Sequence, residues 1–194
     1  MAKGSAFERS ICKMLSLWWS NGTRDDIFWR ATQSGGRATQ RAKSGKRTFG
    51  SYGDIAAVDP IGQPLVQLFT IELKRGRSHG CPNDLFDCRR TKKMKPFEEA
   101  LEQAISSAEL AGTPRWLLIS RRDGRESMAY FPPGAFGHRA SPAMANENTM
   151  FRMRARWTMA NGRKVDFVGY RLDDVLQWVR PTDVLETLKE LKSR

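Results

Sequence analysis

The sequence contains no long hydrophobic run, and no stretch approaches the ~18 apolar residues that a membrane-spanning helix requires. No segment combines an apolar helical face with a lysine-rich polar face, which excludes the usual membrane-surface helix. Histidine is also scarce: His79 and His138 are too few and too poorly placed for a nuclease built on histidine-bound metal. We therefore expect no membrane partner.

Cysteine is similarly rare. The three residues Cys12, Cys81 and Cys88 are an odd number, and no apolar leader precedes the first helix, a pattern that favours a reducing cytoplasm. His79 with Cys81 and Cys88 offers three zinc ligands, but the paired C-x-x-C spacing of a structural zinc site is missing. Neither a disulfide framework nor a zinc site is predicted.

Acidic residues are too few to balance the basic ones. The chain has 33 Lys and Arg against 21 Asp and Glu, a formal charge of +12, which favours a polyanionic partner such as nucleic acid. No acidic residue occurs between Ile27 and Gly53, and the segment 35–51 is rich in glycine and small polar residues. This basic arm is interpreted as a DNA-binding segment, the alternative being a solvated loop. Its basic residues, with the strand residue before it, are Arg30, Arg37, Arg41, Lys43, Lys46 and Arg47.

With 194 residues, of which 40% are hydrophobic, the chain can bury one core, so residues 1–194 are expected to form a single domain. Apolar residues at helical spacing from Phe7 to Trp18 predict a first helix, and Ser5 with Glu8 has the spacing of a capping box. A second helix is expected from Pro96 to Gly112. Strands are predicted over 27–32, 53–59, 65–74 and 115–122, with a hairpin about 60–64 and a buried, central third strand.

After residue 122 the pattern predicts a strand over 127–131 and a hairpin about Asn161-Gly162. Its first strand, 151–159, alternates apolar residues with Arg152, Arg154 and Arg156, interpreted mainly as a solvated face. Two short helices, 172–179 and 182–192, are expected to follow.

One group of residues has the composition of a metal-binding site. Glu72 and Lys74 are two apart on a predicted strand, so their side chains leave the same face. The expected hairpin brings Asp54, at the start of the preceding strand, beside them. Two carboxylates, the backbone carbonyl of Leu73 and water form a hard oxygen site suited to Mg²⁺, with Mn²⁺ able to substitute. Glu8 is placed to reach a metal-bound water or a second ion.

These residues also have simpler interpretations. Glu-x-Lys on an exposed strand is commonly a same-face ion pair, and Glu8 needs no role beyond helix capping. Gln103, on the second helix, is most simply interpreted as a helix-surface glutamine. The combination of Gly53-Asp54 with Glu72 and Lys74 favours catalysis.

At this point the motif resembles a known superfamily. Gly53-Asp54, an interval of 17 residues and then Glu72-Leu73-Lys74 are similar to the signature of PD-(D/E)XK nucleases. The resemblance implies an α/β, restriction-endonuclease-like core (αβββαβ) over about residues 4–122, with a mixed central sheet flanked by helices. Residues 123–194 would be a C-terminal extension with a β-hairpin and short helices.

Within that superfamily, the segments Lys3-Gly4-Ser5 and Phe7-Glu8-Arg9, with Arg30 and Ser34-Gly35, resemble archaeal-type Holliday junction resolvases. The resemblance implies Glu8, Asp54, Glu72 and Lys74 as catalytic, Ser34 as a weaker match at the DNA, and a homodimer. Arg75, which follows the motif, is a further candidate DNA contact.

The sequence therefore predicts a phage or bacterial metal-dependent endonuclease that acts on branched or duplex DNA, with junction resolution as the leading subclass. Two alternatives stay open. One is a DNA-binding or architectural protein that keeps the fold without cleaving, and the other is a restriction or repair nuclease acting on duplex DNA.

Overall fold

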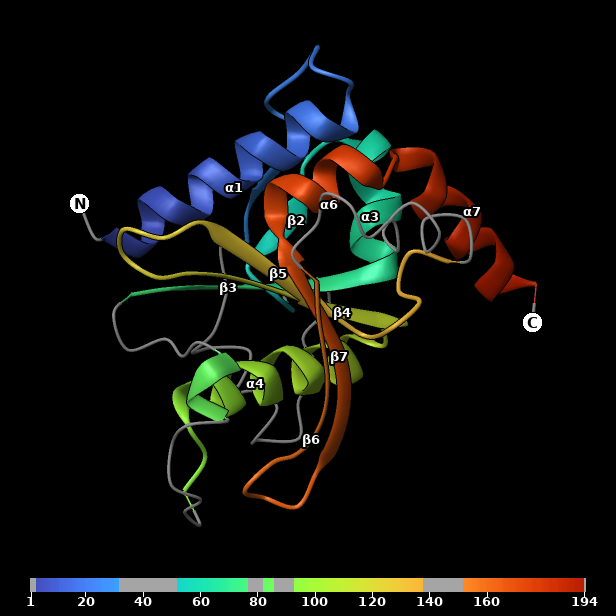
Figure 1. Cartoon of the computed structure of the whole chain (residues 1–194). Coiled ribbons are helices and arrows are strands. Elements are labelled where there is room, and N and C mark those ends of the chain that lie inside the picture. The colour runs from blue at the N-terminus through green and yellow to red at the C-terminus, as the bar shows by residue number, and fades with distance from the viewer. Residues whose placement is uncertain (1–2, 32–51, 77–81, 86–92, 138–151, 194) are drawn as a thin grey trace, which may run out of the picture.

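A computed structural model describes residues 3–31, 52–76, 82–85, 93–137 and 152–193 of the chain (Figure 1). The basic arm, with Ser34 and the predicted contacts Arg37, Arg41, Lys43, Lys46 and Arg47, lies outside these residues. None of the described helices is long and apolar enough to cross a membrane.

The first helix, α1 (Lys3–Trp19), forms where the helical apolar spacing predicts it. Phe7, Ile11 and Leu15 are each at most 2% exposed. The helix begins at Lys3, so Ser5 lies within its first turn rather than before it. The chain then forms β1 (Phe28–Arg30), which pairs with β2 (Ile55–Ala57) in a two-stranded antiparallel sheet.

The predicted hairpin about residues 60–64 is wrong. Pro60–Gly62 forms a 3-10 turn (η1) and Gln63–Leu68 a short helix, α3, so the third strand, β3 (Phe69–Arg75), begins four residues later than expected. Two prolines explain the difference. Pro60 is the first residue of η1 and Pro64 the second residue of α3, positions where the amide has no partner within the helix and the fixed φ of proline favours a helical turn.

The main sheet has five strands in the order β3-β4-β5-β7-β6. β3 runs parallel to β4 (Arg115–Arg121), and α4 (Pro96–Ala111) lies between them in the chain. β5 (Ser127–Phe131), β7 (Lys164–Arg171) and β6 (Arg152–Thr158) follow in antiparallel pairs. The third strand is therefore an end strand of this sheet and not central. It is apolar because helices cover both its faces.

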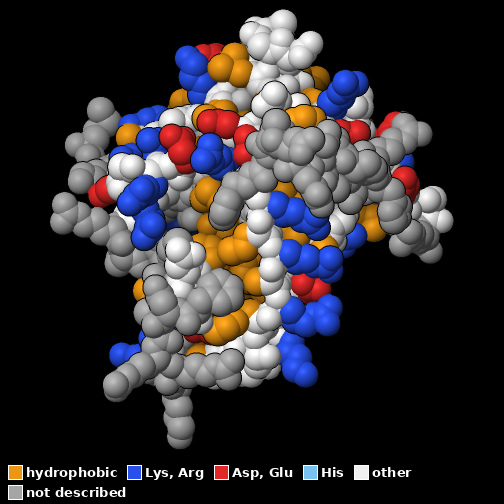
Figure 2. All heavy atoms as spheres, viewed as in Figure 1, with side chains coloured by type: hydrophobic (Ala, Val, Ile, Leu, Met, Phe, Trp, Pro, Cys, Tyr) orange, Lys and Arg blue, Asp and Glu red, His pale blue; other side chains and the backbone are white. Residues whose placement is uncertain are grey.

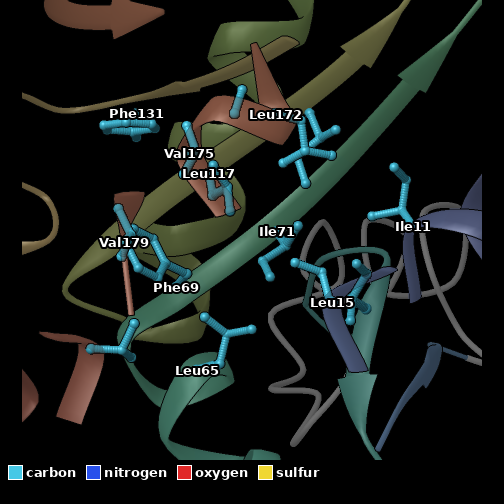
Figure 3. Packing of buried hydrophobic residues seen from close by; sticks show 14 of the residues in the cluster. Ile11, Leu15, Leu65, Phe69, Ile71, Leu117, Phe131, Leu172, Val175 and Val179 are labelled. Atoms are coloured by element: carbon cyan, nitrogen blue, oxygen red, sulfur yellow. The ribbon is translucent and has the colours of Figure 1, made fainter. Parts of the chain in front are cut away.

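Helices cover both faces of the main sheet (Figure 1). On one face, α4 packs on Leu118, Tyr130 and Phe167. On the other face, α1, α3, α6 (Leu172–Trp178) and α7 (Pro181–Lys192) pack on residues such as Ile71 and Leu117 (Figure 3). Residues after 122 thus supply three strands and two helices to the same two clusters. The predicted hairpin forms there, with Gly162 at φ 86° in its turn.

Candidate active site

Strand β3 presents Glu72 and Lys74 to α4. The alternate residues Ile71 and Leu73 point to the opposite face and belong to the cluster beneath α1. Glu72 is only 3% exposed, and the Lys74 side chain is 18% exposed at the end of the strand. Lys74 Nζ lies 3.8 Å from Glu72 Oε2, so the predicted side-by-side arrangement of these two groups is present.

Asp54 reaches the same strand from its open edge. Its backbone amide donates to the carbonyl of Ile71 (2.7 Å), and its Oδ2 accepts from the amide of Leu73 (2.8 Å). These two bonds fix the Asp54 carboxylate beside β3, one residue from Glu72. The predicted convergence of Asp54 and Glu72 is therefore observed, although the connection between their strands is a helical turn.

Gly53 makes this close approach possible. Its φ is +82°, and a Cβ atom there would lie 2.9 Å from the carbonyl oxygen of Ile71 and 3.0 Å from Cγ2 of Thr70. Only glycine avoids both the left-handed strain and the contact with the strand backbone.

We expect Gly53→Ala to lower the free energy of unfolding by about 3 kcal/mol, the sum of left-handed strain and overpacking. Urea unfolding followed by circular dichroism measures this change. Gly162→Ala is the matched control, because Gly162 also has positive φ but a Cβ there would meet no atom within 4 Å. Its expected cost is about 1 kcal/mol. Equal costs at the two positions would contradict the packing argument.

Two residues of α4 complete the site. Gln103 Nε2 donates to Glu72 Oε2 (2.9 Å), and Lys74 Nζ donates to Gln103 Oε1 (2.6 Å). Ser107, one helical turn later, donates to Glu72 Oε1 (2.8 Å). Gln103 is exposed on the helix surface, as the simpler interpretation expects, but it also contacts both motif residues; Ser107 was not anticipated. The sequence did contain one indication of their role: Gln103 and Ser107 are polar, four residues apart, and therefore neighbours beside the apolar stripe of α4.

The carboxyl groups of Asp54 and Glu72 both have raised pKa values. Burial and, after it, the charge of the neighbouring Asp54 carboxylate raise the pKa of Glu72 to about 7, while Lys74 and Ser107 act in the opposite direction. The pKa of Asp54 is also raised, chiefly by burial, despite the hydrogen bond from the Leu73 amide. Perturbed acids of this kind mark sites that bind a cation or transfer protons.

A pH dependence of stability follows for the metal-free protein. The folded protein retains the Glu72 proton up to about pH 7, whereas the unfolded chain releases it near 4.5. Stabilisation from the protonated acid is therefore present below pH 4.5 and is lost as pH rises to about 7. The expected loss is about 3 kcal/mol.

Urea unfolding in a chelator at several pH values measures this slope. Glu72→Gln should lose the pH-dependent contribution, whereas Glu190→Gln, at an exposed position on α7, should retain it. Identical slopes in wild type and Glu72→Gln would contradict a buried, titrating Glu72.

A family comparison agrees with this geometry. The model of the family described as "Phage putative PDDEXK endonuclease" matches residues 1–185. The chain belongs to this phage PDDEXK endonuclease family. No curated protein and no solved structure matches the chain. The predicted PD-(D/E)XK superfamily and restriction-endonuclease-like α/β fold, with a mixed sheet flanked by helices, are confirmed.

Membership of a PDDEXK family raises the question of a metal, since these nucleases generally use divalent ions. Among the described residues, no three His, Cys, Asp or Glu side chains are grouped to hold one ion. Asp54 and Glu72 nevertheless fit, because Mg²⁺ is commonly bound through one or two carboxylates with water completing its shell. A cation there would also offset the burial that raises both pKa values, and the Asp54 charge that adds to the rise at Glu72.

Glu8 lies near this pair but has a partner of its own. On α1, its carboxylate forms an ion pair with Nε of Arg30 from β1. The negative charge of Glu8 helps to raise the pKa of Asp54. Burial, and after it the same charge, raise the pKa of Cys12 to about 12. The metal role of Glu8 and the DNA contact of Arg30 stay predictions.

Of the remaining predicted DNA contacts, Arg75 alone lies within the described residues. Its Nε is 3.7 Å from a carboxylate oxygen of Asp123, and the two side chains are 27% and 32% exposed. The arginine face of β6 is largely exposed, with Arg154 and Arg156 both near Asp166 of β7. This arrangement agrees with the interpretation of that face as a solvated one.

Proposed function

We propose that this phage PDDEXK family member is a divalent-metal-dependent DNA endonuclease, with residues 1–194 acting as one nuclease domain. The main support is that Asp54 and Glu72, two buried carboxylates from separate segments, lie together beside the ammonium group of Lys74. Such an arrangement is costly for stability alone, because buried charges of one sign repel. It is useful if a cation and a phosphate occupy the site.

Asp54, Glu72 and the backbone carbonyl of Leu73 would hold the ion, with Mg²⁺ the expected metal and Mn²⁺ a substitute. When bound, the ion supplies an activated water and neutralises charge on the phosphate. Leu73 contributes through its backbone, whose amide already orients the Asp54 carboxylate.

Lys74 carries the remaining chemistry. Gln103 accepts a hydrogen bond from its ammonium group and donates one to Glu72, so a single side chain fixes both groups. Held in this way, the ammonium can donate to a non-bridging phosphate oxygen or to the attacking water. Charge develops on the phosphate in the transition state, and a preoriented cation stabilises it without reorganising.

For the substrate, we propose branched DNA, with junction resolution by a homodimer as the leading subclass. The support is the resemblance of residues 3–9, and of Arg30 and Ser34-Gly35, to archaeal-type junction resolvases. Glu8, on the first of these segments, would act as a further ligand of the metal centre. The basic arm, Arg30 and Arg75 would bind the DNA backbone.

The test is a cleavage panel with the full chain. Labelled four-way junction, flap, single-stranded and linear duplex DNA are each incubated with Mg²⁺, with Mn²⁺ and with a chelator. The expected result is metal-dependent cutting, with junctions or flaps cut faster than linear duplex. Equal cutting of duplex would favour a restriction or repair nuclease. DNA binding with no cutting under any metal would overturn the proposal in favour of a non-cleaving DNA-binding protein.

A further inference from the structure

A cavity of about 530 Å³ opens where β4 ends and β5 begins, and its lining includes Ser120, the β4 partner of Lys74. This size is within the range of sites that hold small organic ligands. Its lining includes Ser120 of β4, Met128 of β5 and Arg171 of β7. None of these residues contributes to the site of Asp54, Glu72 and Lys74.

The strand register places this cavity on the same sheet face as the catalytic groups. Lys74 pairs with Ser120, Ser120 with Met128, and Met128 with Arg171, so one row of side chains crosses four strands. With strands about 4.8 Å apart, the backbone positions of Lys74 and Arg171 are about 14 Å apart. A few nucleotides of one DNA strand can span that distance.

The cavity has an apolar floor. Met128 and Met153 are half-buried in its lining, and the buried ring of Tyr130 lies over Gly169. A Cβ at Gly169 would lie 2.7 Å from that ring, so the glycine leaves space for the Tyr130 ring to lie flat on β7. Methionine side chains adapt to the shape of whatever they contact.

The rim is basic. Arg122 and Arg125 lie in the turn between β4 and β5, and Arg171 ends β7; all three are exposed. Within the described part of the chain, none of their guanidinium groups forms an ion pair with a carboxylate. Figure 2 shows hydrophobic side chains at the centre of one molecular face with Lys and Arg side chains on both sides. An apolar floor inside a basic rim fits a nucleotide, which combines a flat base with a phosphate.

We propose that this cavity receives an unpaired nucleotide of the DNA strand that is cut, a proposal that rests on the proposed nuclease function. Arg122, Arg125 and Arg171 bind phosphates on either side of the nucleotide, and the two methionines contact its base. The nucleotide must be unpaired, because a base inside a duplex is stacked and cannot enter a pocket unless it is extruded. The cavity thereby selects DNA with a flap, bulge or junction at the cut.

The first test measures salt dependence. Fluorescence anisotropy gives the affinity of a labelled flap DNA for the non-cleaving Asp54→Asn variant, with and without Arg122→Ala/Arg125→Ala. Each lost phosphate contact on a single strand lowers the slope of log affinity against log salt by about 0.7, so the double variant should lose about 1.4. Arg152→Ala/Arg156→Ala is the matched control, because both arginines are exposed on the opposite sheet face. A similar loss in the control would overturn the proposal.

The second test addresses the base. A set of the same flap DNAs is prepared, each with one abasic nucleotide at a different position of the unpaired strand on either side of the cut. One position should lose affinity, and Met128→Ala should remove most of that position-specific effect. Abasic substitution without effect at every position would overturn base binding.

Cleavage by the wild-type chain separates the two proposals. Cutting of flap DNA together with unchanged salt slopes would overturn the cavity proposal alone. The expected slope change without any cutting by wild type would support the cavity and overturn the nuclease.

Discussion

Asp54→Asn should lower the rate of metal-dependent DNA cleavage by at least about 10³-fold, because a bound metal contributes several kcal/mol of transition-state stabilisation. Asparagine has the same shape as aspartate, and its side-chain oxygen can still accept from the Leu73 amide. The fold should therefore be unchanged, and the loss should come from the missing charge. Single-turnover cleavage of a labelled junction or flap, with anisotropy for binding, measures both quantities.

Asp173→Asn is the control for this substitution. Asp173 is an exposed carboxylate in the first turn of α6, a helix that packs on the sheet face opposite α4. Its removal should leave cleavage within a factor of about two, as expected of a surface change. Normal cleavage by Asp54→Asn would contradict the assigned metal site. Loss of DNA binding together with cleavage would show that the substitution disturbs more than one metal ligand.

Lys74→Ala should lower the single-turnover rate by about 10²–10³-fold, the usual effect of removing one preoriented donor from a developing negative charge. Gln103→Ala should have a smaller effect, about tenfold, because the ammonium group remains but loses the acceptor that orients it. Alanine suits a helix, so α4 should stay intact.

The pH–rate profile distinguishes a positioning role of Gln103 from a structural one. Gln103 donates to Glu72, and its loss removes a hydrogen bond that favours the ionised carboxylate. The acidic limb of the profile should therefore move to higher pH in Gln103→Ala. Lys189→Ala, at an exposed position of α7, is the control and should change neither rate nor profile. A reduced rate with an unmoved profile would contradict the positioning role.

Much of the site was predictable because it depends on local rules. Residues two apart on a strand share a face, which placed Glu72 and Lys74 together. Helix α4 was predicted with its ends, since Pro96 stands at its start and Gly112 caps its last turn at φ 70°. The meeting of Asp54 with Glu72 was also predicted, although for the wrong reason, because the expected hairpin is a helical turn.

Other features depend on contacts that a single sequence does not reveal. The run from Leu65 to Leu68 is apolar enough for either a strand or a helix, and the packing of α3 against the rest of the fold decides between them. Gln103 and Ser107 have ordinary helix-surface chemistry, and their role depends on how α4 lies across β3. The strand order, which makes β3 an end strand, depends on residues after 122.

The indole of Trp18, on α1, donates a hydrogen bond to the backbone carbonyl of Val179 (2.8 Å), so the first helix makes one of its contacts with residues near the other end of the sequence. During translation, α1 emerges long before that partner exists. The sheet face on which α1 packs is therefore complete only when residues up to and beyond 179 are present. A chain interrupted earlier would carry Asp54, Glu72 and Lys74 but lack the residues of α6 and α7 that pack on the other face of β3 and its neighbours.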